Sequence, residues 1–103
     1  MLYAAPTLQS DSETATAGYF KLSWKSPNNT SLRPVTFELE QALSPSFSDA
    51  RLYDVGSDTA TVLSGLKSNT YHYRVRESGG DWSSTISVVV QHHSLERAFL
   101  FFG

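Results

Sequence analysis

The feature that most constrains the fold of this chain is a two-residue hydrophobic period, which turn-forming residues interrupt roughly every eight to twelve positions. In residues 18–25, for example, Phe20, Leu22 and Trp24 alternate with polar or exposed positions. Because successive side chains of a β-strand point to opposite faces, each such segment buries one face and leaves the other in water. Many short strands of this kind predict an antiparallel β-sandwich and not a barrel.

Seven strands are predicted, at residues 6–10, 18–25, 35–42, 51–55, 59–66, 70–77 and 82–91. The segment 51–55 reads as a short edge strand. The sequence does not decide which face of the strand at 59–66 is buried. Either Thr61 and Leu63 or Ala60 and Val62 can point into the core, because both pairs fit the alternation. Only residues 94–102 have helical character. The fold class is therefore all-β.

Length and composition exclude several classes of protein. The chain has 103 residues, enough for one domain with a single core. It has no cysteine, so a disulfide framework and a cysteine-ligated zinc site are excluded. Its formal charge is −2, without a basic stripe, so nucleic acid is not a predicted partner. We expect no cofactor.

Four stretches of this chain give it a resemblance to a known family. They are an early "PTL", Trp24 in "KLSWKSP", Phe37 in "VTFELE", and the run "LSGLKSNTYHYRVR". Together they resemble a fibronectin type III domain over residues 6–91, of the bacterial, extracytoplasmic type. The resemblance implies a seven-stranded immunoglobulin-like antiparallel β-sandwich, with a core led by Trp24, Phe37, Tyr71 and Tyr73.

The resemblance also implies a tyrosine corner. In that family a leucine before the sixth strand is followed by a tyrosine that starts the strand and closes the turn by a side-chain to backbone hydrogen bond. Leu66 and Tyr71 match these two roles. The spacing is one residue tighter than the family pattern, and Ser68 and Asn69 stand where a proline and a glycine are usual.

Catalytic and metal-binding constellations are not found in the sequence. There is no G-x-S-x-G motif, and no nucleophile, base and acid are placed to converge. His92 and His93 are adjacent, so on extended backbone they point in opposite directions and do not share a metal ion. We therefore predict no catalytic, metal-binding or cofactor-binding residues. The chain reads as a non-enzyme.

Two glutamates and two arginines are predicted to form ion pairs. Glu38 and Glu40 lie on the outward face of one predicted strand, and Arg74 and Arg76 lie on the outward face of another. In this fold the two strands are neighbours, so cross-strand ion pairs explain the carboxylates without a glycosidase site.

The role of Trp82 has two interpretations. Its context "DWSS" resembles half of the tryptophan–serine signature of cytokine-receptor modules, in which indole rings stack on guanidinium groups. Trp82 is then expected to cover Arg74 or Arg76 by a cation–π contact. The alternative is an aromatic platform for a sugar ring or a partner. Asn29 joins these three as a candidate contact residue, because "NNTS" holds two overlapping glycosylation sequons in a predicted surface loop.

The sequence favours a non-catalytic extracytoplasmic module for protein interaction, adhesion or spacing, as part of a membrane-anchored protein. Its predicted location is extracellular, periplasmic or at the cell surface, and loops 26–34 and 78–82 are its predicted contact loops. The alternative is a carbohydrate-binding accessory module of a secreted enzyme, which would bind polysaccharide through Trp82, Tyr19 or Tyr53.

The two ends of the chain are assigned as tails. Residues 1–5 form an N-terminal tail and residues 92–103 an apolar C-terminal tail in which Ser94 can cap a helix. One interpretation makes this tail the start of a membrane helix that continues after Gly103. The other is self-association through its apolar side chains, Phe99, Leu100, Phe101 and Phe102.

Overall fold

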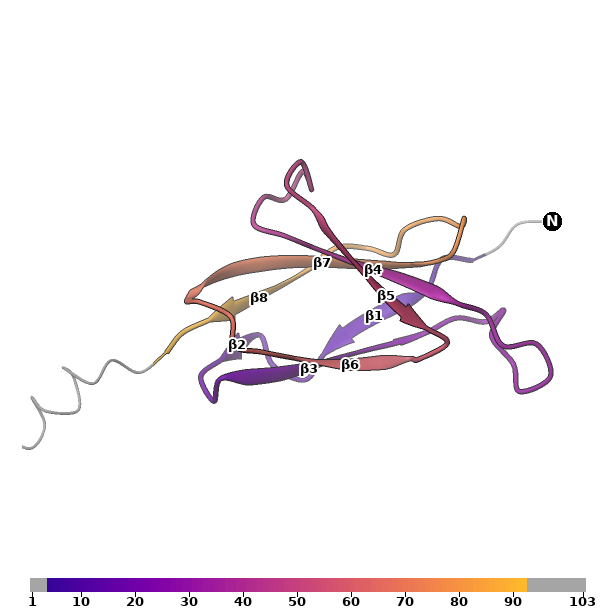
Figure 1. Cartoon of the computed structure of the whole chain (residues 1–103), viewed down its shortest axis with the longest axis horizontal. Helices are drawn as coiled ribbons and strands as arrows, with labels where there is room; N and C mark the ends of the chain where they lie inside the picture. Colours follow the sequence, from indigo (N-terminus) through magenta and orange to yellow (C-terminus); the bar gives the residue numbers. More distant parts are fainter. Residues whose placement is uncertain (1–3, 93–103) are drawn as a thin grey trace, which may run out of the picture.

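A computed structural model describes residues 4–92, which form two β-sheets packed face to face (Figure 1). The eight strands are β1 (Thr7–Ser10), β2 (Thr14–Ala15), β3 (Tyr19–Lys25), β4 (Phe37–Ala42), β5 (Arg51–Gly56), β6 (Ala60–Ser64), β7 (Asn69–Glu77) and β8 (Ile86–Val90). One sheet has the order β1-β3-β6 and the other the order β2-β8-β7-β4-β5. The predicted all-β sandwich is confirmed.

The strand count differs from the predicted seven because the N-terminal segment divides between the sheets. β1 pairs antiparallel with β3, and the chain then crosses to the other sheet, where β2 pairs parallel with β8. Thr14 lies opposite Val89, and Ala15 opposite Val90. A two-residue strand has too few positions to show an alternating pattern, so the sequence did not reveal β2.

Two strands begin two or more residues later than predicted. The strand predicted at 82–91 begins only at Ile86, because Ser83 is bound to β7 in another way. The N–H of Ser83 donates to the carbonyl oxygen of Val75 at 2.8 Å, and the N–H of Val75 donates to Ser83 Oγ at 3.0 Å. The strand predicted at 35–42 begins at Phe37.

The open question about the facing of β6 is settled by burial. Leu63 is 7% exposed and belongs to the core, whereas Val62 is 59% exposed. The alternation of β6 therefore places Thr61 and Leu63 toward the opposite sheet. β5 lies at the edge of the five-stranded sheet, as its sequence predicted.

Aromatic side chains from both sheets meet in the core. Phe20 and Tyr73 pack edge to face with ring centroids 5.8 Å apart, and Trp24 and Phe37 do the same at 6.0 Å. Burial of such large apolar groups contributes about 1.5–3 kcal/mol each, which is how a cysteine-free domain of this size is held together. Each pair joins one residue of the three-stranded sheet to one of the five-stranded sheet.

The predicted helix at 94–102, its cap Ser94, and the apolar residues from Phe99 to Phe102 lie outside the described residues. Within residues 4–92, no helix of the length and hydrophobicity needed to span a bilayer is found.

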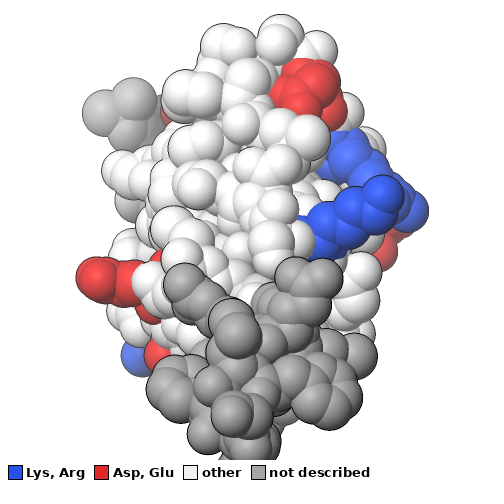
Figure 2. All heavy atoms as spheres, turned by 90° about the vertical axis from the view of Figure 1, so that its left-hand side faces the viewer, with Lys and Arg blue, Asp and Glu red and all other residues white. Residues whose placement is uncertain are grey.

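At the end of the molecule turned toward the viewer in Figure 2, acidic and basic side chains are scattered in separate groups around a largely uncharged surface.

Candidate functional site

The outer face of the five-stranded sheet carries two cross-strand ion pairs. The register of β4 and β7 places Arg74 opposite Glu40 and Arg76 opposite Glu38. Arg74 Nη2 lies 2.6 Å from Glu40 Oε1, and Arg76 Nε lies 2.9 Å from Glu38 Oε1. Both carboxylates are engaged by guanidinium groups and are held as ion-pair partners, not as an acid/base pair.

Trp82 lies against both arginines. The Cζ atoms of Arg74 and Arg76 are each 4.4 Å from the centroid of the Trp82 ring, within the range of a cation–π contact. The two guanidinium groups project from the same face of β7, since the residues are two apart on one strand. The bonds of Ser83 to Val75 fix the backbone beside this face and so position the preceding indole.

Phe47 extends this arrangement, and no pattern in the sequence predicts this contact. Its ring centroid lies 4.2 Å from Arg74 Cζ, and its side chain is buried although it comes from the loop between β4 and β5. Its backbone has φ of 58°, a left-handed conformation that costs a non-glycine residue about 1–2 kcal/mol. The series Phe47, Arg74, Trp82 and Arg76 is called the cation–π ladder below.

Asp49 holds the loop that presents Phe47. Its carboxylate accepts hydrogen bonds from the N–H groups of Leu43 and Ser44, at 3.0 and 3.2 Å, and from the Ser44 hydroxyl at 2.7 Å. The Ser44 hydroxyl, followed by the Leu43 amide, lowers the pKa of Asp49 below its ordinary value. In the sequence, the serine and aspartate residues of "LSPSFSDA" are the feature that indicates such a capped turn.

The residues predicted as structural lie in and around the core. Trp24, Phe37 and Tyr73 are almost fully buried. The Tyr71 hydroxyl donates a 2.8 Å hydrogen bond to the carbonyl oxygen of Lys67, and Leu66 is half-buried against the core.

Asn29 has a role within its own loop. Its Oδ1 accepts a hydrogen bond from the N–H of Val35 at 3.1 Å, which closes the loop that connects β3 to β4. The neighbouring Asn28 donates through Nδ2 to Glu77 Oε2 at 2.7 Å, which ties this loop to the end of β7. The two loops at this end of the sandwich are therefore held together by side chains.

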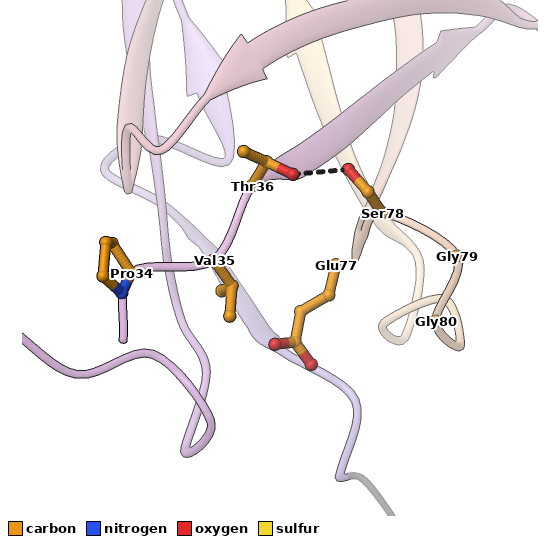
Figure 3. Close-up of a pocket in the computed structure, with 7 residues that line it drawn as sticks. All are labelled: Pro34, Val35, Thr36, Glu77, Ser78, Gly79 and Gly80. Carbon is orange, nitrogen blue, oxygen red and sulfur yellow. Dashed lines mark hydrogen bonds between the residues drawn. The ribbon is translucent and has the colours of Figure 1, made fainter. Parts of the chain in front are cut away.

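An open groove lies where these loops meet, with a volume of about 440 Å³ (Figure 3). Residues 34–36 form one side and residues 77–80 the other. The two sides are joined by the hydroxyls of Thr36 and Ser78, 2.9 Å apart, and by a backbone hydrogen bond from Ser78 N to Thr36 O at 2.9 Å. Gly79, with φ of 80°, lies in the tight turn on one side of the groove.

The lining of the groove is mixed in polarity. Its lining residues carry the hydroxyls of Thr36 and Ser78, the Glu77 carboxylate and the partly buried side chain of Val35. In the part of the chain from 4 to 92, no three histidine, aspartate or glutamate residues are grouped so as to hold a metal ion.

Solved structures with a similar fold indicate the class of domain to which this chain is related. The solution structure of the fibronectin type III domain of human fibronectin type III domain containing protein 3 is similar, with a TM-score of 0.61 and 25% identity over 91% of this chain and 88% of that one. A β-sandwich protein obtained by computer-based redesign has a TM-score of 0.58 and 22% identity, over 91% of this chain and 97% of that one. The chain is a fibronectin type III-like domain.

A third similar structure is that of the FN1-FN3 domains of chicken CNTN1, with a TM-score of 0.54 and 19% identity over 80% of this chain and 32% of that one. No protein-family model and no curated protein matches the sequence. The fold indicates a module for protein interaction or spacing, and domains of this fold are generally non-catalytic.

Proposed function

We propose that this domain is a non-catalytic, extracytoplasmic interaction module that contacts a protein partner at the end of the sandwich formed by residues 26–36 and 77–82. The observation that carries the proposal is the open groove between residues 34–36 and 77–80. Its walls are cross-linked by the Asn28–Glu77 and Thr36–Ser78 hydrogen bonds, so the groove is preformed. A preformed site loses less conformational entropy when it binds.

The engagement of Trp82 supports a protein partner over a polysaccharide. A sugar platform requires an aromatic face that is open to the ligand, and the Trp82 ring is already in contact with two guanidinium groups. Tyr19, which is 59% exposed, remains the best-placed aromatic side chain for the carbohydrate-binding alternative. A glycan array tests that alternative, with Tyr19→Ala and Trp82→Ala as the variants that should abolish any signal.

The location belongs to the proposal as well. We place the domain outside the cytoplasm, as the outer part of a membrane-anchored protein, because apolar residues fill positions 98–102 of the C-terminal tail. Protease digestion of intact cells that produce the full natural protein tests this placement. Cleavage of the domain without lysis is expected, and protection until lysis contradicts it.

Site-specific photo-crosslinking in the native host tests the contact surface. A photoreactive amino acid at Ser78 borders the groove, and the same amino acid at exposed Thr16 lies next to β2, outside the groove. An adduct of defined mass at Ser78, with none at Thr16, is expected. Equal adducts at both positions, or none at Ser78, contradict the proposal.

The apolar tail has its own test. We propose that residues 99–102 cause the isolated chain to associate, since a contiguous apolar patch seldom stays exposed. Light scattering should give a larger mass for the intact chain than for a chain that lacks residues 95–103. A monomeric intact chain at high concentration contradicts self-association.

A further inference from the structure

β6 leaves one edge of the three-stranded sheet unpaired. It pairs antiparallel with β3 along Ala60–Ser64, and within residues 4–92 no strand lies on its other side. Its sequence, ATVLS, contains no charged residue and no proline. Sheet edges are ordinarily blocked by lysine, proline, a bulge or a covering segment, because their unpaired N–H and C=O groups recruit further strands. β6 has no such blocking residue.

A slot opens between the two sheets beside this edge. It has a volume of about 390 Å³ and lies between β5 and β6. Its lining includes the core leucines Leu39 and Leu63 and the partly buried Tyr53 and Val55. A strand added to β6 would lie about 4.8 Å from it, over the mouth of the slot. Alternate side chains of that strand would then enter the slot, and the others would lie beside Val62.

The charge of the slot selects among the strands that could be added. Asp58, in the turn that leads into β6, is in its lining, which includes no lysine, arginine or histidine. Among the described residues, Asp58 takes part in no salt bridge. A strand that brings a cation to this place would therefore be favoured, and one that brings a carboxylate would be repelled.

We infer that the β6 edge and its slot form a second docking surface, which takes an extended peptide segment by strand addition. The segment carries apolar side chains on one face and at least one lysine or arginine that meets Asp58. Main-chain hydrogen bonds to β6 supply affinity, and the slot and the Asp58 carboxylate supply specificity. This surface is separate from the groove at residues 34–36 and 77–80, so it stands independently of the proposed function.

A second copy of the chain fits this surface less well. Leu63 of β6 is buried in the core of its own sandwich, so a second copy paired through β6 does not place this side chain in the slot. A strand of five residues also buries little of the ~1,200–2,000 Å² that stable specific interfaces require. A cationic segment from a different chain can continue beyond β6 and place its own side chains in the slot.

The experiment uses a peptide of alternating valine and lysine, capped at both ends, added to the isotope-labelled chain while backbone amide NMR shifts are recorded. Two matched peptides serve as controls. One carries glutamate in place of each lysine, and the other has every second backbone nitrogen methylated, which removes the donors of the strand ladder. Val62→Lys is the blocking variant, and Asp58→Asn is the charge variant. Leu32→Lys is the matched control, because Leu32 is 92% exposed in a different loop.

The lysine peptide is expected to shift the amides of residues 53–64 and to bind about tenfold or more tightly than either control peptide. Val62→Lys and Asp58→Asn should lose this binding by a similar factor, and Leu32→Lys should keep it. The inference is overturned if the lysine peptide does not bind, if the glutamate peptide binds equally well, or if the shifts map to residues 26–36 and 77–82. Concentration-dependent shifts of residues 60–64 without any peptide would assign the edge to a second copy and would also overturn it.

Discussion

The hydroxyl group of Tyr71 donates a 2.8 Å hydrogen bond to the carbonyl oxygen of Lys67, four residues earlier in the chain. This bond spans the turn that leads from β6 in one sheet to β7 in the other. The bond therefore ties this turn to the beginning of β7.

Replacement of Tyr71 by phenylalanine tests the contribution of this bond. Tyr71→Phe keeps the shape of the ring and leaves the Lys67 carbonyl without its partner, so we expect a loss of about 1–3 kcal/mol in the free energy of unfolding. Denaturant melts measure it. Tyr19→Phe is the matched control, since Tyr19 is exposed on the outer face of β3. Equal midpoints for Tyr71→Phe and wild type would remove the assigned role.

The cation–π ladder predicts a fluorescence change. The double variant Arg74→Ala, Arg76→Ala exposes the Trp82 indole to water, so the emission should shift to longer wavelength. Loss of the contacts should cost about 0.5–2 kcal/mol for each arginine, less where the contact is well solvated. Because Trp24 also emits, the same two substitutions are made in Trp82→Phe, where no shift is expected. An unshifted emission in the presence of Trp82 contradicts the ladder.

From the raised pKa of Tyr73 we predict that the domain becomes less stable to unfolding at alkaline pH. Burial, with smaller effects from Tyr53 and Tyr71, raises the pKa of Tyr73 above its ordinary value of 10.0, and its hydroxyl donates to Gln41 Oε1 at 2.8 Å. Above pH 10 the unfolded state releases this proton and the folded state keeps it, so stability falls as pH rises. Urea midpoints should decline above pH 10 in wild type and decline less in Tyr73→Phe. Tyr19→Phe should follow wild type, and identical curves for all three would contradict the prediction.

From the lowered pKa of Asp49 we predict a loss of stability at the acid end of the pH range. Its pKa is lowered by the Ser44 hydroxyl and the Leu43 amide, so the stability that it contributes is present above pH 3.8 and is lost as the pH falls through its folded-state pKa. An NMR titration of its side-chain carboxyl carbon should give a pKa below 3.8 in wild type. In Ser44→Ala the pKa should rise toward that value. A wild-type titration at 3.8 would show that the hydrogen bonds to Asp49 do not persist in solution.

Much of the sandwich could be predicted because alternation is a local property. The two-residue period of β3, for instance, assigns Phe20, Leu22 and Trp24 to one face whatever the partner strand is, and all three are buried. The same period placed Arg74 and Arg76 on one outward face of β7. Their pairing with Glu40 and Glu38 followed from the neighbouring positions of two strands, which the family resemblance supplied.

Other features depend on contacts between distant segments, which a local pattern does not encode. The two residues of β2 are a strand only because β8 lies beside them, and the backbone at Ser83 leaves the ladder because its hydroxyl bonds to Val75. Phe47 is buried because Asp49 folds its loop back over Arg74.

The sequence by itself therefore determined the class of fold and the core faces of its strands, because hydrophobic burial acts on each strand through its own two-residue period. Only the tertiary structure decided the groove at residues 34–36 and 77–80, the slot beside β6 and the second arginine contact of Trp82. Each of these depends on the distance between side chains from different strands or loops, and packing of the two sheets sets that distance.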